Sequence, residues 1–136
     1  MNRPIKFRAL IKPELKMVSV YSLEWTNLEL AVSWLDDKTT TGKREVMAPF
    51  NYELTQFTGL TDKNGKEIYE GDIFNCIYDF DGCKKHKQAV VYVEVSARFI
   101  TKDYGECHQP NVMQNMSDMI RMEVIGNIYE NPELLI

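Results

Sequence analysis

Cysteine and histidine residues give the first candidate chemistry in this chain, because thiolates and imidazoles are the ligands that zinc prefers. They are Cys76, Cys83, His86, Cys107 and His108. The spacing is unlike that of a structural zinc site, since no Cys-x2-Cys pair is present. Cys76 also falls in a predicted strand, where a cysteine usually packs as a small hydrophobic residue. We predict no bound metal and no cofactor, and a metal-binding protein or enzyme remains the second alternative.

Catalytic arrangements are equally sparse. There is no Gly-x-Ser-x-Gly motif, and adjacent residues such as Cys107 and His108 usually point apart, which makes a dyad a weak reading. Glu67, Glu70 and Asp72 share one turn, which could hold a cation or a general base. The simpler interpretation is that these carboxylates accept local backbone N–H groups. We therefore predict that the protein is not an enzyme and has no catalytic residues.

Basic residues form two short groups, and phosphate-binding glycine loops are absent. In 5–11 apolar and basic residues largely alternate, which is the period-two pattern of a half-buried strand with a cationic outer face. A short basic run lies in the loop after Gly82. Solvated surface, or protection of a sheet edge by lysine, explains such groups without a ligand. The candidate interaction surface comprises Lys6, Arg8, Lys12, Lys84, Lys85 and Lys87.

The elements that must position these residues are mostly short strands. Alternation and β-branched residues predict strands at 5–11, 17–21, 28–35, 73–78, 88–95 and 122–128, with another starting at Phe99. Turns are expected at Asp62–Gly65 and around Gly71, and 36–52 reads as a loose crossing segment. Methionines in 111–120 have helix-like spacing, which favours a short core-facing helix or plug over a binding surface. Asn131 and Pro132 predict the start of a short terminal helix.

Length and charge set the outer bounds. The chain has 136 residues, 44% hydrophobic and 26% charged, which fits one globular domain and excludes disordered and fibrous classes. Residues 1–20 hold five basic residues and one acidic residue, so this +4 segment faces −8 in the remainder of a chain of net charge −4. The acidic total argues against a broadly basic nucleic-acid binder. Three cysteines, no apolar run of membrane length and no signal peptide predict a cytoplasmic protein.

Three blocks of sequence, in order, resemble the YopX family of phage and prophage proteins. The first is Ile5–Ala9, the central one runs from Gln56 to Ile73, and the last runs from Val124 to Leu135. The resemblance implies a β-rich fold with a small barrel-like sheet in its C-terminal half. It also implies no established activity and no catalytic residues to transfer. The matched blocks read as turns, strand starts and a helix cap, which a fold needs whatever its function.

Together these patterns predict one mainly β, α+β domain over residues 1–136. Residues 1–53 would form an N-terminal hairpin and crossing segment. Residues 54–136 would form a small bent antiparallel barrel, similar in size to an SH3 domain, and a short C-terminal helix. For function we predict a phage- or prophage-encoded, non-catalytic module in the host cytoplasm that binds a host or phage protein or self-associates as a homo-oligomer through the hairpin. The alternative is a nucleic-acid-binding barrel whose exposed aromatics Phe80, Tyr92 and Phe99 stack bases. No membrane partner is expected.

Overall fold

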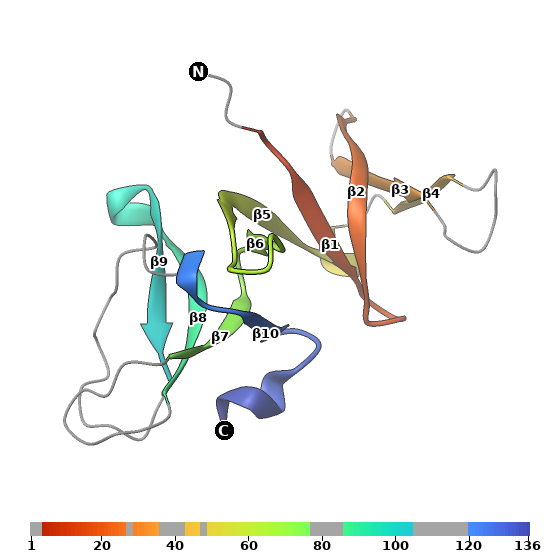
Figure 1. The fold of residues 1–136 in the computed structure, drawn as a ribbon. Coiled ribbons are helices and arrows are strands. Elements are labelled where there is room, and N and C mark those ends of the chain that lie inside the picture. The colour runs from red at the N-terminus through yellow and green to blue at the C-terminus, as the bar shows by residue number, and fades with distance from the viewer. Residues whose placement is uncertain (1–3, 27–28, 36–42, 47–48, 77–85, 105–119) are drawn as a thin grey trace. The chain divides into compact units, whose positions relative to one another are not determined.

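The computed structural model describes residues 4–26, 29–35, 43–46, 49–76, 86–104 and 120–136, and antiparallel strands dominate them (Figure 1). Contacts divide the chain into two units. One comprises residues 5–56, and the other is built mainly from residues 57–136. The prediction of a mainly β protein is confirmed. No helix among the described residues is both long and apolar enough to cross a membrane.

The unit of residues 5–56 is a twisted antiparallel sheet. Its strands hydrogen-bond in the order β4-β3-β2-β1-β5, so β1 lies between two partners. The predicted N-terminal hairpin is present as β1 and β2, with Ala9 opposite Val18. The strands and the 3₁₀ turn are β1 (Phe7–Ile11), β2 (Lys16–Trp25), β3 (Leu30–Leu35), β4 (Lys43–Val46), η1 (Pro49–Asn51) and β5 (Tyr52–Thr61).

β2 pairs with two neighbours along different parts of its length, and it contains a bulge. Residues 16–19 pair with β1, whereas residues from Val20 onward pair with β3. The register shifts by one residue between Val20 and Ser22, which makes Tyr21 the extra residue. A bulge sharpens local twist and bends the strand. It also moves the core-facing side chains from even positions (Val18, Val20) to odd ones (Leu23).

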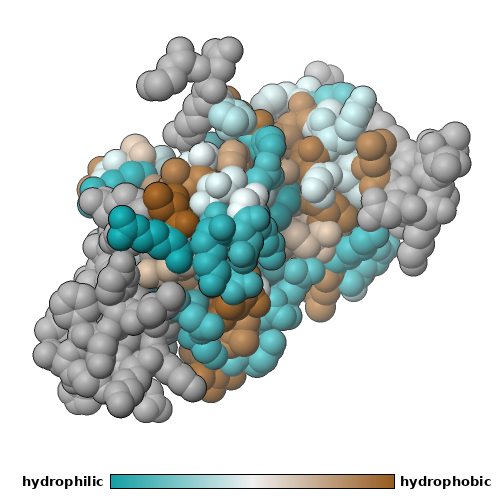
Figure 2. Space-filling model, viewed as in Figure 1, coloured by the Kyte–Doolittle hydropathy of each residue, from teal (hydrophilic) through white to brown (hydrophobic). Residues whose placement is uncertain are grey.

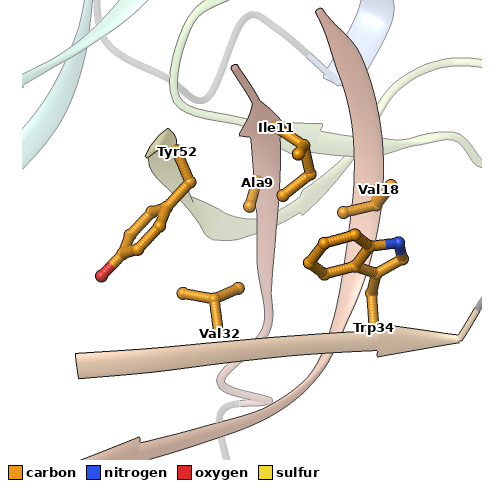
Figure 3. Packing of buried hydrophobic residues seen from close by; sticks show 6 residues of the cluster. All are labelled: Ala9, Ile11, Val18, Val32, Trp34 and Tyr52. Atoms are coloured by element: carbon orange, nitrogen blue, oxygen red, sulfur yellow. The ribbon is translucent and has the colours of Figure 1, made fainter. Parts of the chain in front are cut away.

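The resulting curl encloses a hydrophobic cluster. Figure 3 shows side chains from β1, β2 and β3 facing one another with Tyr52 beside them: Ala9, Ile11, Val18, Val32, Trp34 and Tyr52. The Tyr52 hydroxyl donates a 2.9 Å hydrogen bond to the Leu30 carbonyl of β3. Three inter-strand steps separate β5 from β3, about 14 Å in a flat sheet. Because a tyrosine side chain cannot span that gap, the sheet must be strongly curled here.

The second unit contains a four-stranded antiparallel sheet in the order β10-β7-β8-β9. One face carries a second buried cluster, made of Ile68, Phe74, Val90, Met122 and Val124. Leu60 and Phe99 pack against this cluster. The elements are β6 (Glu67–Tyr69), β7 (Asp72–Cys76), β8 (His86–Val93), η2 (Glu94–Ser96), β9 (Arg98–Asp103), β10 (Val124–Asn127) and η4 (Pro132–Leu135).

Two fold predictions were wrong. The first is the barrel over 54–131, because the described strands form open sheets and β9 and β10, which end the four-stranded sheet, do not pair. The reason is β5, most of which the prediction placed in the barrel although its residues 52–56 pair with β1. The second is the loose segment 36–52, where β4 pairs with β3 and η1 precedes β5. The methionine-rich stretch 111–119 lies outside the described residues.

The terminal helix begins where predicted but is capped differently. Asn131 is the N-cap and Pro132 follows it in η4, a single 3₁₀ turn. The Asn131 side chain makes no hydrogen bond to the N–H groups of its own helix. Instead its Oδ1 accepts the backbone N–H of Asn127, at 3.3 Å. The residue that starts the helix therefore fastens it to the end of β10.

Candidate functional site

The N-terminal basic residues are not the open cationic stripe that the sequence predicts. β1 is paired on both sides, so Lys6, Arg8 and Lys12 do not protect a sheet edge, and that prediction was wrong. Arg8 is half-buried, and Leu10, on the same face of β1, is buried. Lys12 Nζ lies 3.2 Å from a Glu53 carboxylate oxygen on β5. Part of this positive charge is therefore paired or half-buried within the unit of residues 5–56.

The second basic group is only partly described. Lys84 and Lys85 lie outside the described residues. Lys87 belongs to β8 and is half-buried, and its carbonyl accepts the Tyr104 N–H at 2.9 Å. The structure thus attaches the described member of this group to the β8–β9 hairpin.

The zinc candidates fall mostly outside the described residues. Cys83, Cys107 and His108 are among those not described. Cys76 and His86 are opposite each other in the β7–β8 ladder. Within the described part of the chain, no three His, Cys, Asp or Glu side chains are grouped as a metal site would require. The absence of a metal therefore remains a prediction.

Asp62 is a buried carboxylate that works as a backbone clamp. Its Oδ1 accepts N–H bonds from Asn64 and Lys66 at 2.8 and 2.9 Å, and its Oδ2 accepts that of Val124 at 3.1 Å. Lys63 N–H also donates to the Met122 carbonyl. Burial alone would raise the pKa of Asp62, but the three N–H groups and the Lys66 charge outweigh it and hold the pKa below its ordinary value. Asp62 ties the β5–β6 turn to the start of β10.

In the second turn, Asp72 follows the simpler interpretation, because it accepts a local backbone N–H group. Asp72 is fully buried, and its Oδ2 accepts the Tyr69 N–H at 2.8 Å. Glu67 accepts the Tyr69 hydroxyl at 2.8 Å. Gly71 donates its N–H to Val90 and accepts that of Ile128. These contacts engage Asp72 and Glu67 in local structure, which leaves a cation or general-base role without support.

A third polar network closes the chain. Asn127 Oδ1 accepts the N–H groups of Tyr129 and Glu130, at 3.0 and 2.9 Å. Its Nδ2 donates to a Glu130 carboxylate oxygen at 2.7 Å. Together with Asp62 and Asp72, this network lies within the central and final blocks of the family resemblance. Those blocks therefore encode turns and anchors.

Large hydrophobic side chains are exposed in the unit of residues 5–56. Trp25 and Tyr21, both on β2, are 83% and 64% exposed. Leu35 at the end of β3 and Phe50 in η1 are exposed as well. Figure 2 shows brown hydrophobic side chains reaching the surface among teal and white ones. Aromatic residues of this size are frequent energetic centres of protein interfaces.

Sequence reasoning placed Tyr21 in a strand without assigning it a role, and it missed Trp25. The expected strand ended at Tyr21, because the bulge breaks the period-two alternation at that residue. Ser22, Leu23, Glu24 and Trp25 then alternate again with the opposite parity, a signal that a search for bulged strands would have found. Of the predicted base-stacking aromatics, Phe80 is not described. Tyr92 and Phe99 contact each other, with ring centroids 5.2 Å apart.

The comparisons with known proteins agree with this architecture. A family model described as "YopX protein" matches residues 6–136. The crystal structure of protein EF1440 from Enterococcus faecalis is similar, with a TM-score of 0.65 and 26% sequence identity over 99% of this chain and 100% of that one. No curated protein matches. Because the family model spans nearly all residues, and the resembling blocks lie in the turns and anchors of the fold, the chain belongs to the YopX family.

Proposed function

We propose that this chain is a non-catalytic interaction module that associates with a second copy of itself, with Trp25 and Tyr21 of β2 at the centre of the contact. The observation that carries the proposal is the exposure of two large aromatic side chains on one strand. An exposed tryptophan gains most when a partner removes it from water, since aromatic residues bury 150–250 Å² each, as a rough range.

The charge distribution indicates whether electrostatic attraction can hold two copies together. Residues 5–56 contain seven basic and seven acidic residues, so this unit has no net charge and residues 57–136 are the acidic part. Opposite net charges on two units therefore do not drive head-to-tail contact. The hairpin of β1 and β2 remains the contact in this proposal, through its aromatic residues more than through Lys6 and Arg8.

Sedimentation equilibrium at high micromolar concentration tests the proposal. We expect wild type to form a dimer or larger oligomer, and Trp25→Ala to shift the mass toward the monomer. Val95→Ala is the matched control, because Val95 is fully exposed in η2 of the other unit. A monomeric wild type, or a Trp25→Ala protein with unchanged mass, would overturn self-association through β2. A monomer that bound a host or phage protein through Trp25 would make that protein the partner instead.

A phage or prophage origin and action in the bacterial cytoplasm belong to the same proposal. The resemblance of the three sequence blocks to phage and prophage proteins supports both. The neighbouring genes test the origin: genes of phage replication or assembly beside this one are expected. Neighbours of purely metabolic function would count against it.

A further inference from the structure

The β8–β9 hairpin carries cations without described partners. Lys87 on β8 and Arg98 and Lys102 on β9 take part in no ion pair among the described residues. Elsewhere in the chain, Lys12 forms an ion pair with Glu53, and Lys63 Nζ lies 3.5 Å from a Glu123 carboxylate oxygen. Among the described residues, no carboxylate is paired with the three cations of this hairpin.

The strand register puts these cations on one face. Lys102 is opposite Ala89, Arg98 is opposite Val93, and the Tyr104 N–H donates to the Lys87 carbonyl. Alternation along both strands then places Lys87, Arg98, Lys102 and Tyr104 on the same side. The buried residues Ala89 and Ile100 lie on this side too, between Arg98 and the other three. Lys102 Nζ lies 5.3 Å from the centroid of the Tyr104 ring, which is partly exposed. We name these four residues the cationic face.

Like charges directly opposite each other cost stability, and diagonal neighbours are still within reach of long side chains. Lys87 and Lys102 are diagonal neighbours across the ladder, and no described carboxylate compensates them. An external polyanion would remove this cost. An aromatic ring beside an ammonium group adds a surface on which a base can stack, which a simple anion-binding site would not need.

We infer that the cationic face binds single-stranded nucleic acid, with its cations contacting phosphates and Tyr104 stacking against a base. Proteins that bind single strands without sequence preference combine these same two features, a basic track and exposed aromatic rings. The negative net charge of the chain does not oppose this, because a local patch sets the local potential. The inference goes beyond the proposed function, since it concerns another unit and another ligand.

Fluorescence anisotropy with a labelled oligothymidine of about 16 nucleotides, a length that covers known site sizes, tests the inference. Binding should weaken steeply between about 50 and 200 mM salt, as phosphate contacts do. The double variant Lys87→Glu/Lys102→Glu should lose at least tenfold in affinity and lower the slope of log affinity against log salt by about 1.4. Tyr104→Ala should bind more weakly than Tyr104→Phe, which keeps a ring for stacking.

The matched control is Lys16→Glu/Arg121→Glu, which changes the net charge by the same amount at other sites. Thermal unfolding of every variant establishes that it is folded. Wild type that shows no binding at 50 mM salt would overturn the inference, and so would equal losses in the two double variants. Tighter binding to polyglutamate than to the oligonucleotide at the same salt would assign the face to an acidic protein. None of these results depends on the oligomeric state, so the proposal for β2 is tested separately.

Discussion

Asp62 joins parts of the chain that are 62 residues apart, and its two oxygens have different tasks. Oδ1 closes the local turn, whereas Oδ2 accepts the N–H of Val124 in β10. In Asp62→Asn one of these oxygens becomes an NH2 group, which cannot accept. A buried N–H donor then faces another donor, which costs about 1–3 kcal/mol. We expect urea unfolding to show a loss of this size.

The control is Glu123→Gln, which removes a charge near the same turn. The side chains of Lys63 and Glu123 are each about half exposed, and such ion pairs contribute about 0–1 kcal/mol.

The pH dependence of stability distinguishes the contribution of Asp62 from that of Glu123. Because the folded-state pKa of Asp62 is lowered, its stabilisation is present above the unfolded pKa, about 4, and is lost as the pH falls through the folded value. The wild-type advantage over Asp62→Asn should hold at neutral pH and shrink in acid; an advantage unchanged by acid would contradict the assignment.

At the scale of elements, the turn between β6 and β7 depends on close approach as well as on conformation. Gly71 has φ +85°, and a Cβ there would lie 2.9 Å from Tyr129 Cε2 and 3.3 Å from Ile128 Cγ1. Gly65 has a similar φ of +79°, but nothing lies within 4 Å of its Cβ position. Gly65→Ala should therefore cost only the backbone strain, about 1–2 kcal/mol. Gly71→Ala should cost about 1–3 kcal/mol more, from overpacking.

Thermal or urea unfolding of the two glycine variants measures this difference directly. Each variant is the control for the other, since both carry the same backbone penalty. Equal losses would show that the contact of Gly71 with Ile128 and Tyr129 does not limit the packing of this turn.

Elements were predictable where local pattern and pairing agree. Alternation in 5–11 and β-branched residues near Val90 predict β1 and β8. Burial is more extensive than the alternation suggests, because Leu10 is buried as well as Ala9, and Ala89 as well as Val90. The partner of β5 was not predictable, since its pairing with β1 joins residues about 45 apart in the sequence. The closed barrel failed for this reason.

The candidate site was less predictable than the fold. Lys87 was identified from its basic neighbours, but the register that aligns it with Lys102 and Tyr104 depends on the β8–β9 ladder. Trp25 was missed because a one-residue bulge hides the strand that carries it. Local composition shows which residues are charged or aromatic, whereas pairing decides which of them share a face.

For the whole molecule, each of the two units has a hydrophobic cluster of its own. Val32 is fully buried in the cluster of residues 5–56, and Val90 is fully buried in that of the other unit. Each substitution to alanine removes two buried methyl-sized groups and leaves a cavity, at a cost of about 2–3 kcal/mol. Regions with separate cores open as separate cooperative units.

The amide hydrogen exchange rates of the two units should therefore respond separately to substitutions in their cores. Val32→Ala should accelerate exchange mainly in β1, β2 and β3, and Val90→Ala mainly in β7, β8 and β10. The two variants serve as reciprocal controls, because residue type and burial match. Uniform acceleration across both units in either variant would show that the chain opens as one cooperative body.

The extra residue in β2 gives this strand something like a reading frame. Side chains alternate between the two faces of the sheet, so the face on which each residue after Tyr21 lies depends on the presence of Tyr21. If Tyr21 were deleted, Leu23 and Trp25 would exchange faces with Ser22 and Glu24. Deletion of Tyr21 should consequently destabilise far more than Tyr21→Ala, which keeps the count and removes only an exposed ring. Comparable melting temperatures for the two would mean that β3 can shift by one residue to restore the frame. A length change at this one position thus acts on the protein as a frameshift acts on a message.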